Sequence, residues 1–342
     1  MSTTAIQTRF RPRLPVGHFL RTHTWAFAAV ATLVLLIANI VALPNFGNPK
    51  YYAGTLASLA PFAIVAMAST PAILSGGGGI DVSIGPLMGL VNILFVTELL
   101  PHGLGDVEIA LPIMLLVGAL VGLINGLAVT KLRQQPVIAT VCMYFILGGL
   151  NLKLAGTPVG AHANWTDDLG NKIGPIPGAL LTIGAPLAIW FGLRRTAFIR
   201  NLYSVGGDDA AAYAAGIRVA MVRTLAYVIG GVFAAIAGIA LTAINRSADA
   251  SIPPQYTLIA IAAVALGGTS LMGGRGGLAG ALFGAAIIYL IQTLLASLHV
   301  TSDWLPVVYG LLLLIGIVTT ALVSTGLPRL VPLARHRPRG EN

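Results

Sequence analysis

Residues 53–100 read AGTLASLAPFAIVAMASTPAILSGGGGIDVSIGPLMGLVNILFVTELL, two apolar stretches joined by four consecutive glycines and one acid. An apolar stretch of about 20 residues has the length of a helix that crosses the hydrocarbon core of a bilayer. The first stretch therefore predicts a membrane-spanning helix. The glycines that follow predict a break in the backbone before the next helix begins.

The rest of the 342 residues has the same character, because hydrophobic residues make up 56% of the chain and charged residues only 9%. A water-soluble domain carries about a quarter of its residues as charged ones. We therefore expect an all-α polytopic membrane protein with about ten transmembrane helices. Glycine and proline interrupt several of them, so eight or nine full spans would also fit. The predicted spans are 25–43, 53–74, 86–100, 109–130, 137–155, 177–193, 223–244, 257–272, 278–297 and 305–325.

The basic residues predict the orientation of these helices. With a cytoplasmic N-terminus and ten spans, sixteen of the twenty Lys and Arg residues fall on the inside, leaving Lys50, Lys153, Lys172 and Arg246 outside. An excess of Lys and Arg marks cytoplasmic loops. We expect cytoplasmic basic segments at 1–24 and 326–342, flanking one membrane domain at 25–325. The net charge of +9 follows from topology and anionic lipid, and implies no nucleic acid.

The chain lacks the residue sets of an enzyme. Its six histidines fall in the termini and loops, and it contains no Gly-x-x-x-x-Gly-Lys-Ser/Thr phosphate loop. We expect no catalytic residues, metal or cofactor, and the single Cys142 is interpreted as a small packing residue. Asp81 is the one acid predicted at membrane depth, where it or Ser83 would cap the helix that begins near Gly85.

One inner loop, at 203–217, has a pattern of its own. Asp208 and Asp209 precede an alanine run and Gly216 follows it, which predicts a short helix with acids at its positive end. Such a helix could bind in a groove of another protein, or it could be a surface turn between two spans that binds nothing. Glycine runs at 76–79 and 267–277 each interrupt an apolar region, a faint sign of internal duplication.

Three stretches together resemble the permease subunits of ribose-type ATP-binding-cassette (ABC) sugar importers. They are Gly78-Gly79-Ile80-Asp81-Val82-Ser83-Ile84-Gly85, Gln135-Pro136-Val137-Ile138-Ala139-Thr140 after Asn125-Gly126, and the 203–217 loop together with 260–276. The likeness covers about residues 50–325. Tyr213 stands where the family frequently has a basic residue. Gly76 and Gly77 replace the usual Thr or Ala, from which we expect a looser loop.

The resemblance implies a subunit of the bacterial inner membrane that moves a sugar or sugar-like polyol but hydrolyses no ATP itself. Its partners would be a second permease subunit (homo- or heterodimer), a cytoplasmic ATPase, a periplasmic sugar-binding protein and membrane lipid. The amino-acid branch of the same superfamily and an ion-coupled secondary carrier are the alternatives.

The resemblance also assigns roles to three sets of residues. The coupling loop to the ATPase would comprise Gly206, Gly207, Asp208, Asp209, Ala211 and Gly216. The broken-helix loop would comprise Gly78, Gly79, Asp81, Ser83 and Gly85. Small and neutral polar groups would line the path of the solute: Ser83, Asn92, Asn125, Thr140, Thr269 and Ser270. Each of these side chains could instead hold a neighbouring helix.

Overall fold

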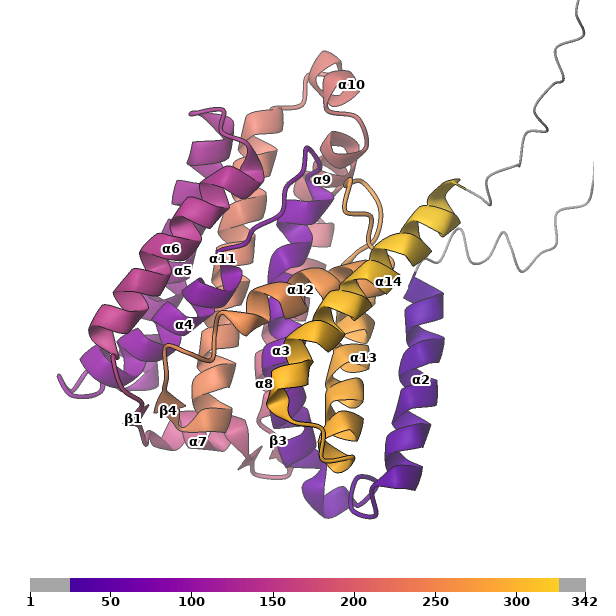
Figure 1. Cartoon of the computed structure of the whole chain (residues 1–342). Helices are drawn as coiled ribbons and strands as arrows, with labels where there is room; N and C mark the ends of the chain where they lie inside the picture. The colour runs from indigo at the N-terminus through magenta and orange to yellow at the C-terminus, as the bar shows by residue number, and fades with distance from the viewer. Residues whose placement is uncertain (1–24, 326–342) are drawn as a thin grey trace, which may run out of the picture.

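The computed structural model describes residues 25–325, which form a bundle of helices (Figure 1). The predicted cytoplasmic segments 1–24 and 326–342 lie outside the described residues. The longer helices are α2 (Trp25–Ala42), α3 (Tyr52–Leu74), α5 (Val107–Thr130), α6 (Pro136–Leu154), α11 (Val219–Asn245), α13 (Leu278–Ser297) and α14 (Leu305–Thr325). The shorter ones are α4 (Ile84–Leu94), α7 (Asn164–Gly170), α8 (Ala179–Arg194), α9 (Ala197–Gly207), α10 (Asp209–Ala214) and α12 (Gln255–Leu266).

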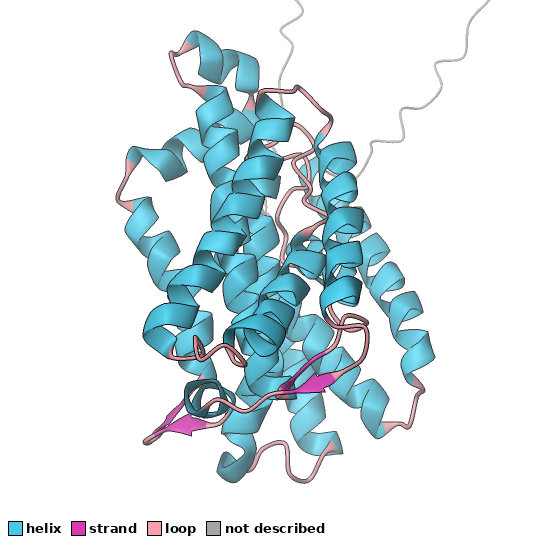
Figure 2. Ribbon diagram, turned by 90° about the vertical axis from the view of Figure 1, so that its left-hand side faces the viewer, coloured by secondary structure: helices cyan, strands magenta, loops and turns pink. Residues whose placement is uncertain are grey.

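Within residues 25–325, strands form only two minimal ribbons, far from α10 (Figures 1 and 2). Strand β1 (Val159–Gly160) pairs antiparallel with β4 (Ser247–Ala248), with Val159 opposite Ala248. Strand β2 (Lys172–Ile173) pairs with β3 (Ile176–Pro177). Single helical turns occur at η1 (Pro49–Tyr51), η2 (Phe95–Leu99, of π type) and η3 (Ser302–Trp304).

The expectation of an all-α membrane protein is confirmed. Each of the ten predicted ranges contains a helix, but within residues 25–325 only six helical segments have the length and apolar composition of a full crossing. The shorter apolar segments are Ile84–Leu99, Ala179–Arg194, Gln255–Leu266 and Leu305–Val318.

Helix α11 lies at the centre, packed against α3, α4 and α5. The helix backbones approach closely because glycines face one another: a Cβ on Gly231 would overlap the carbonyl of Gly118 in α5. Small residues at membrane helix interfaces permit this approach. Helix α3 is buried on all sides from Ala60 to Leu74, as expected for an apolar helix at the core of a bundle.

The short helices α4 and α12 interrupt the pattern of long helices, and α12 runs across the bundle in Figure 1. The same local turn precedes both of them. Ser83 donates from its N and Oγ to Asp81 Oδ1 (2.9 and 2.7 Å), and Ser251 donates likewise to Asp249 Oδ1 (2.8 and 2.7 Å). An Asp-x-Ser-Ile tetrapeptide therefore introduces each short helix.

The interpretation of Cys142 as a packing residue is wrong. Its side chain is exposed on the outer face of α6. The sequence around Cys142 does not indicate which side of α6 is exposed, because apolar residues occur on all sides of this helix. In the structure α6 buries only Thr140, Leu147 and Asn151.

Candidate functional site

The broken-helix loop connects the end of α3 to the start of α4 through a sharp turn. Gly76, Gly77 and Gly78 adopt positive φ angles of 71°, 63° and 72°, which L side chains rarely adopt. A Cβ on Gly79 would overlap the carbonyl oxygen of Ala72. The glycines thus fold the chain back against the end of α3.

A buried polar cluster forms at the far end of this loop. Asp81 Oδ1 accepts both bonds from Ser83, and Asn125 Nδ2 of α5 donates to Ser83 Oγ (2.9 Å), with Asp81 Oδ2 3.5 Å away. Asp81 is 3% exposed and Ser83 is fully buried. The structure therefore brings Asn125, predicted as a path residue, into contact with Ser83 and Asp81 of the broken-helix loop.

Two further helices hold the same loop. Val82 N donates to Thr140 Oγ1 of α6 (3.2 Å), and Thr257 Oγ1 of α12 donates to Val82 O (3.0 Å). Gly85 lies close against Thr257, because a Cβ there would be 2.5 Å from Thr257 Oγ1. The loop is therefore bonded to α5, α6 and α12.

Ser83 occupies the predicted N-cap position, but the side chain of neither Ser83 nor Asp81 accepts a hydrogen bond from the first backbone N–H groups of α4. Ser83 is the N-cap residue of α4, but its hydroxyl makes no capping bond and donates to Asp81 instead. Asp81 accepts the N–H of Ser83, one residue before the helix begins. The Asp81 carboxylate therefore shapes the turn that leads into α4.

The other predicted path residues lie elsewhere in the bundle. Asn92 Nδ2 of α4 donates to Thr242 Oγ1 (2.8 Å) and Ser247 O (3.1 Å), at the β-ribbon end. Thr269 and Ser270 lie in the loop 267–277, where Thr269 Oγ1 accepts from Gly277 N (3.2 Å). The set thus divides among three places: the Asp81 cluster, Asn92, and the loop after α12.

The predicted short helix is confirmed as α10, which stands out at one end of the molecule (Figure 1). Asp208 caps it by accepting from Ala211 N (3.0 Å), and Gly216 follows it with φ 83°. Asp209 forms an ion pair with Arg223 at the start of α11 (2.9 Å).

Arg223 is a contact residue between α10 and the broken-helix loop that the sequence analysis missed, because that analysis counted it only as a loop charge. Besides Asp209, its Nε donates to Ser75 O (3.4 Å), and a Cβ on Gly77 would be 2.6 Å from its Nη2. Arg223 therefore joins α10 to the broken-helix loop. One feature of the sequence could have indicated this contact: Arg223 stands at the start of an apolar run, fourteen residues after Asp209, which could serve as its ion-pair partner.

The expectation that Gly76 and Gly77 loosen the loop is wrong. Gly76 lies against the backbone of Gly206 in α9, and Gly77 lies against the guanidinium of Arg223. Both positions lack a side chain because other groups occupy the space.

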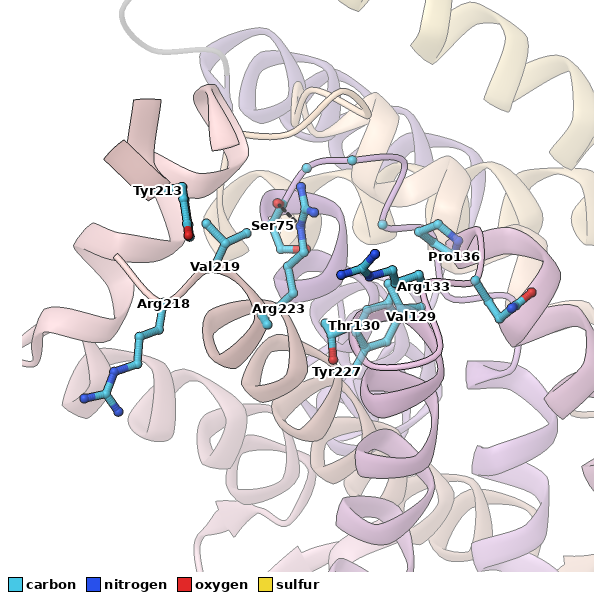
Figure 3. A pocket seen from close by; sticks show the side chains of 15 residues that line it. Ser75, Val129, Thr130, Arg133, Pro136, Tyr213, Arg218, Val219, Arg223 and Tyr227 are labelled. Carbon is cyan, nitrogen blue, oxygen red and sulfur yellow. Dashed lines mark hydrogen bonds between the residues drawn. The ribbon is translucent and has the colours of Figure 1, made fainter. Parts of the chain in front are cut away.

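A cavity of about 540 Å³ opens beside the broken-helix loop, between α10, α11 and the 131–136 turn (Figure 3). Arg133, Arg218, Arg223, Tyr213 and Tyr227 are among the lining residues. In Figure 3 Arg223 reaches toward Ser75, whereas the Arg218 guanidinium points away from the other two arginines.

Burial raises the pKa of the Tyr203 phenol in α9 above its ordinary value, and the charge of Arg194 opposes this in part. The phenol is therefore protonated at neutral pH and donates to Gly276 O (2.7 Å). Residues 25–325 contain no group of three His, Cys, Asp or Glu side chains positioned to hold a metal ion.

Comparison with known proteins places the chain in a family. The sequence model of the family described as branched-chain amino acid transport system / permease component matches residues 51–317. The ribose import permease protein RbsC of Bacillus subtilis is 36% identical over 290 residues, 83% of this chain and 88% of that protein.

Two further relatives are similar over comparable lengths. RbsC of Escherichia coli K12 is 33% identical, covering 84% of this chain and 91% of its own, and the fructose import permease protein FrcC of Rhizobium meliloti is 30% identical, covering 88% and 86%. No solved structure matches the chain. The chain therefore belongs to this permease-component family and is a multi-pass inner-membrane permease subunit of the ribose-type ABC importers.

Proposed function

We propose that this chain forms, with a second permease subunit, the membrane path through which a sugar or sugar-like polyol enters the cell. A separate ATPase docks on α9 and α10 from the cytoplasm, and a periplasmic binding protein delivers the solute at the opposite end. The observation that carries the proposal is α10, a capped short helix that presents small side chains and Tyr213, 76% exposed, outside the bundle.

The distribution of charge supports this orientation. The loops and helix ends on the α10 side carry Lys131, Arg133, Arg194, Arg195, Arg200, Arg218, Arg223 and Arg275. Lys50, Lys153, Lys172 and Arg246 belong to the other side, and Arg246 pairs there with Asp167 (3.1 Å). The excess of basic residues supports a cytoplasmic position for the α10 end.

The buried polar groups favour a neutral solute over an amino acid. Among residues 25–325, Asp81 is the one buried side chain of the Asp, Glu, Lys, Arg and His types, and Ser83 and Asn125 already bond to it. An amino acid brings an ammonium and a carboxylate, and each loses solvation free energy unless an opposite charge meets it. Hydroxyl groups need only hydrogen-bond partners. The sugar permeases among the relatives support the same choice, although the family description names amino acids.

The test of the docking site replaces Tyr213 with alanine. An exposed tyrosine at the centre of a docking surface typically contributes about 2 kcal/mol or more to binding, so Tyr213→Ala should weaken ATPase association about 30-fold. Solute-stimulated ATP hydrolysis in liposomes should fall in parallel. The matched control is Tyr51→Ala. Tyr51 is also exposed (53%), but it precedes the first residue of α3, at the end of that helix away from α10.

Equal ATPase affinity in Tyr213→Ala and Tyr51→Ala would refute docking at α10. Liposomes that hold only this permease and accumulate solute against its gradient would identify a secondary carrier instead. In the complete transporter, uptake of an amino acid but of no sugar would move the assignment to the amino-acid branch.

A further inference from the structure

Three glycine-bearing segments meet at the cytoplasmic end with no side chain between them. They are the broken-helix loop at Gly76, the last turn of α9 at Gly206, and the 267–277 loop at Gly274. A Cβ on Gly206 would overlap Leu74 O and lie 2.6 Å from Gly274 N, and a Cβ on Gly76 would lie 2.9 Å from Gly206 Cα. We call this contact of Gly76, Gly206 and Gly274 the glycine junction.

Hydrogen bonds fasten the same three segments. Gly274 N donates to Leu74 O (3.1 Å), which joins the two loops directly. Tyr203 Oη of α9 donates to Gly276 O (2.7 Å), which joins α9 to the second loop. Arg223 joins α10 to the first loop through Asp209 and Ser75 O.

Each loop is continuous with one of the two short helices. The first leads from α3 into α4 and carries Asp81, while the second leads out of α12 and carries Thr269. Thr257 of α12 also bonds to Val82 O, so the two short helices are in contact near the Asp81 cluster. A displacement of α9 therefore meets the backbones of both loops at one point.

We propose that the glycine junction transmits the movement of α9 and α10 to both short helices at once, with Gly206 as the positioning residue. Backbone packed on backbone has no rotatable side chain that could absorb a displacement, and close-packed contacts transmit strain. The junction thus moves α4 and α12 together when the ATPase moves α10. This inference rests on the proposed docking of the ATPase at α9 and α10.

The test compares three variants in the transporter assembled with its ATPase and binding protein. Gly206→Ala forces the segments apart, and Tyr203→Phe removes one hydroxyl without adding volume. Gly192→Ala is the matched control, since Gly192 lies near the end of α8 with open space around its Cβ position. The readout is the amount of solute transported per ATP hydrolysed, alongside ATPase affinity and the thermal midpoint.

We expect Gly206→Ala to lower the solute transported per ATP about 5- to 150-fold, the usual range for coupling between two sites. Tyr203→Phe should lower it about 2- to 12-fold, as for the loss of one neutral hydrogen bond. Gly192→Ala should match the wild type. A defect confined to folding would lower the thermal midpoint and the amount of assembled complex without changing this ratio.

Spin labels supply a readout that needs no defective variant. In a Cys142→Ser background, Ser204→Cys on α9 and Met272→Cys in the second loop place labels on two exposed positions. The distance between these labels should stay the same with and without nucleotide, while the distance from either label to one on α2 should change. A nucleotide-dependent change between Ser204 and Met272 would overturn the proposal.

A wild-type transport ratio in assembled Gly206→Ala would overturn it too. If Gly206→Ala does not assemble, a wild-type ratio in Tyr203→Phe has the same meaning. These results differ from failure of the proposed function, in which Tyr213→Ala binds the ATPase as tightly as the wild type does.

Discussion

The buried Asp81–Ser83 turn predicts a coupling between two substitutions in their effect on the free energy of unfolding, and a similar exposed turn in the same chain provides the control. Asp81→Ala removes the acceptor of two hydrogen bonds from Ser83 and of the longer contact from Asn125. Ser83→Ala removes the hydroxyl that donates to Asp81 and accepts from Asn125. The two substitutions share one interaction, the 2.7 Å bond from Ser83 Oγ to Asp81 Oδ1.

The shared bond sets the size of the expected non-additivity. A hydrogen bond contributes about 1 kcal/mol net when neutral and about 1.5–3 kcal/mol when one partner is charged. Each single variant loses this bond, but the double variant loses it only once. The destabilisation of the double variant should therefore be smaller than the sum of the two single values by about 1–3 kcal/mol.

The second Asp-x-Ser turn is the matched control. Asp249 and Ser251 form the same two bonds at nearly the same distances, but at an exposed site. Water replaces lost bonds there, so the cycle of Asp249→Ala and Ser251→Ala should give a coupling below about 0.5 kcal/mol.

Unfolding of the four variants of each cycle in mixed micelles of mild detergent and dodecyl sulfate measures both couplings. Additive effects at the buried pair, within about 0.5 kcal/mol, would refute the claim that burial strengthens this turn. Equal couplings at the two sites would refute it as well.

Two further predictions concern the packing around α11. Asn92→Ala removes the bonds to Thr242 and Ser247 and should lower the free energy of unfolding by about 1–3 kcal/mol; an unchanged unfolding midpoint would show that these bonds are dispensable. Gly231→Ala should cost about 1–3 kcal/mol by overpacking against α5, whereas Gly148→Ala in the open face of α6 should leave the midpoint unchanged or raise it; a wild-type midpoint in Gly231→Ala would contradict the close contact.

Within residues 25–325 the sequence predicted the position of each apolar helix, because a helix satisfies all the backbone hydrogen bonds of a long apolar run in a bilayer within the run itself. It predicted α10 as well, since Asp208, Asp209 and Gly216 are residues that begin and end a helix. The residues that it named for the proposed coupling loop lie in one segment for this reason. Local rules were sufficient wherever the structure depends on neighbours along the chain.

The contacts between distant segments could not be predicted in this way. The glycine junction joins three residues that are far apart in the sequence: Gly76, Gly206 and Gly274. The sequence alone does not distinguish a glycine in a mobile turn from a glycine packed between two backbone segments. The interpretation of Gly76 and Gly77 as loosening residues failed for that reason. Arg223 was missed because its partners, Asp209 and Ser75, become neighbours only after α11 packs against α3.

The two Asp-x-Ser turns show how the same local sequence acquires different roles through packing. Both are formed by the same backbone and side-chain bonds, and both precede a short helix. Before α4, Asn125 and Thr140 enclose the turn, and the glycine junction connects its loop to α9. Before α12, Ser251 is exposed. A buried turn with fixed partners moves with the elements that hold it, whereas an exposed one is free to follow its own helix. The difference between the two turns is thus the arrangement expected if, as proposed above, the movement reaches the short helices through α9.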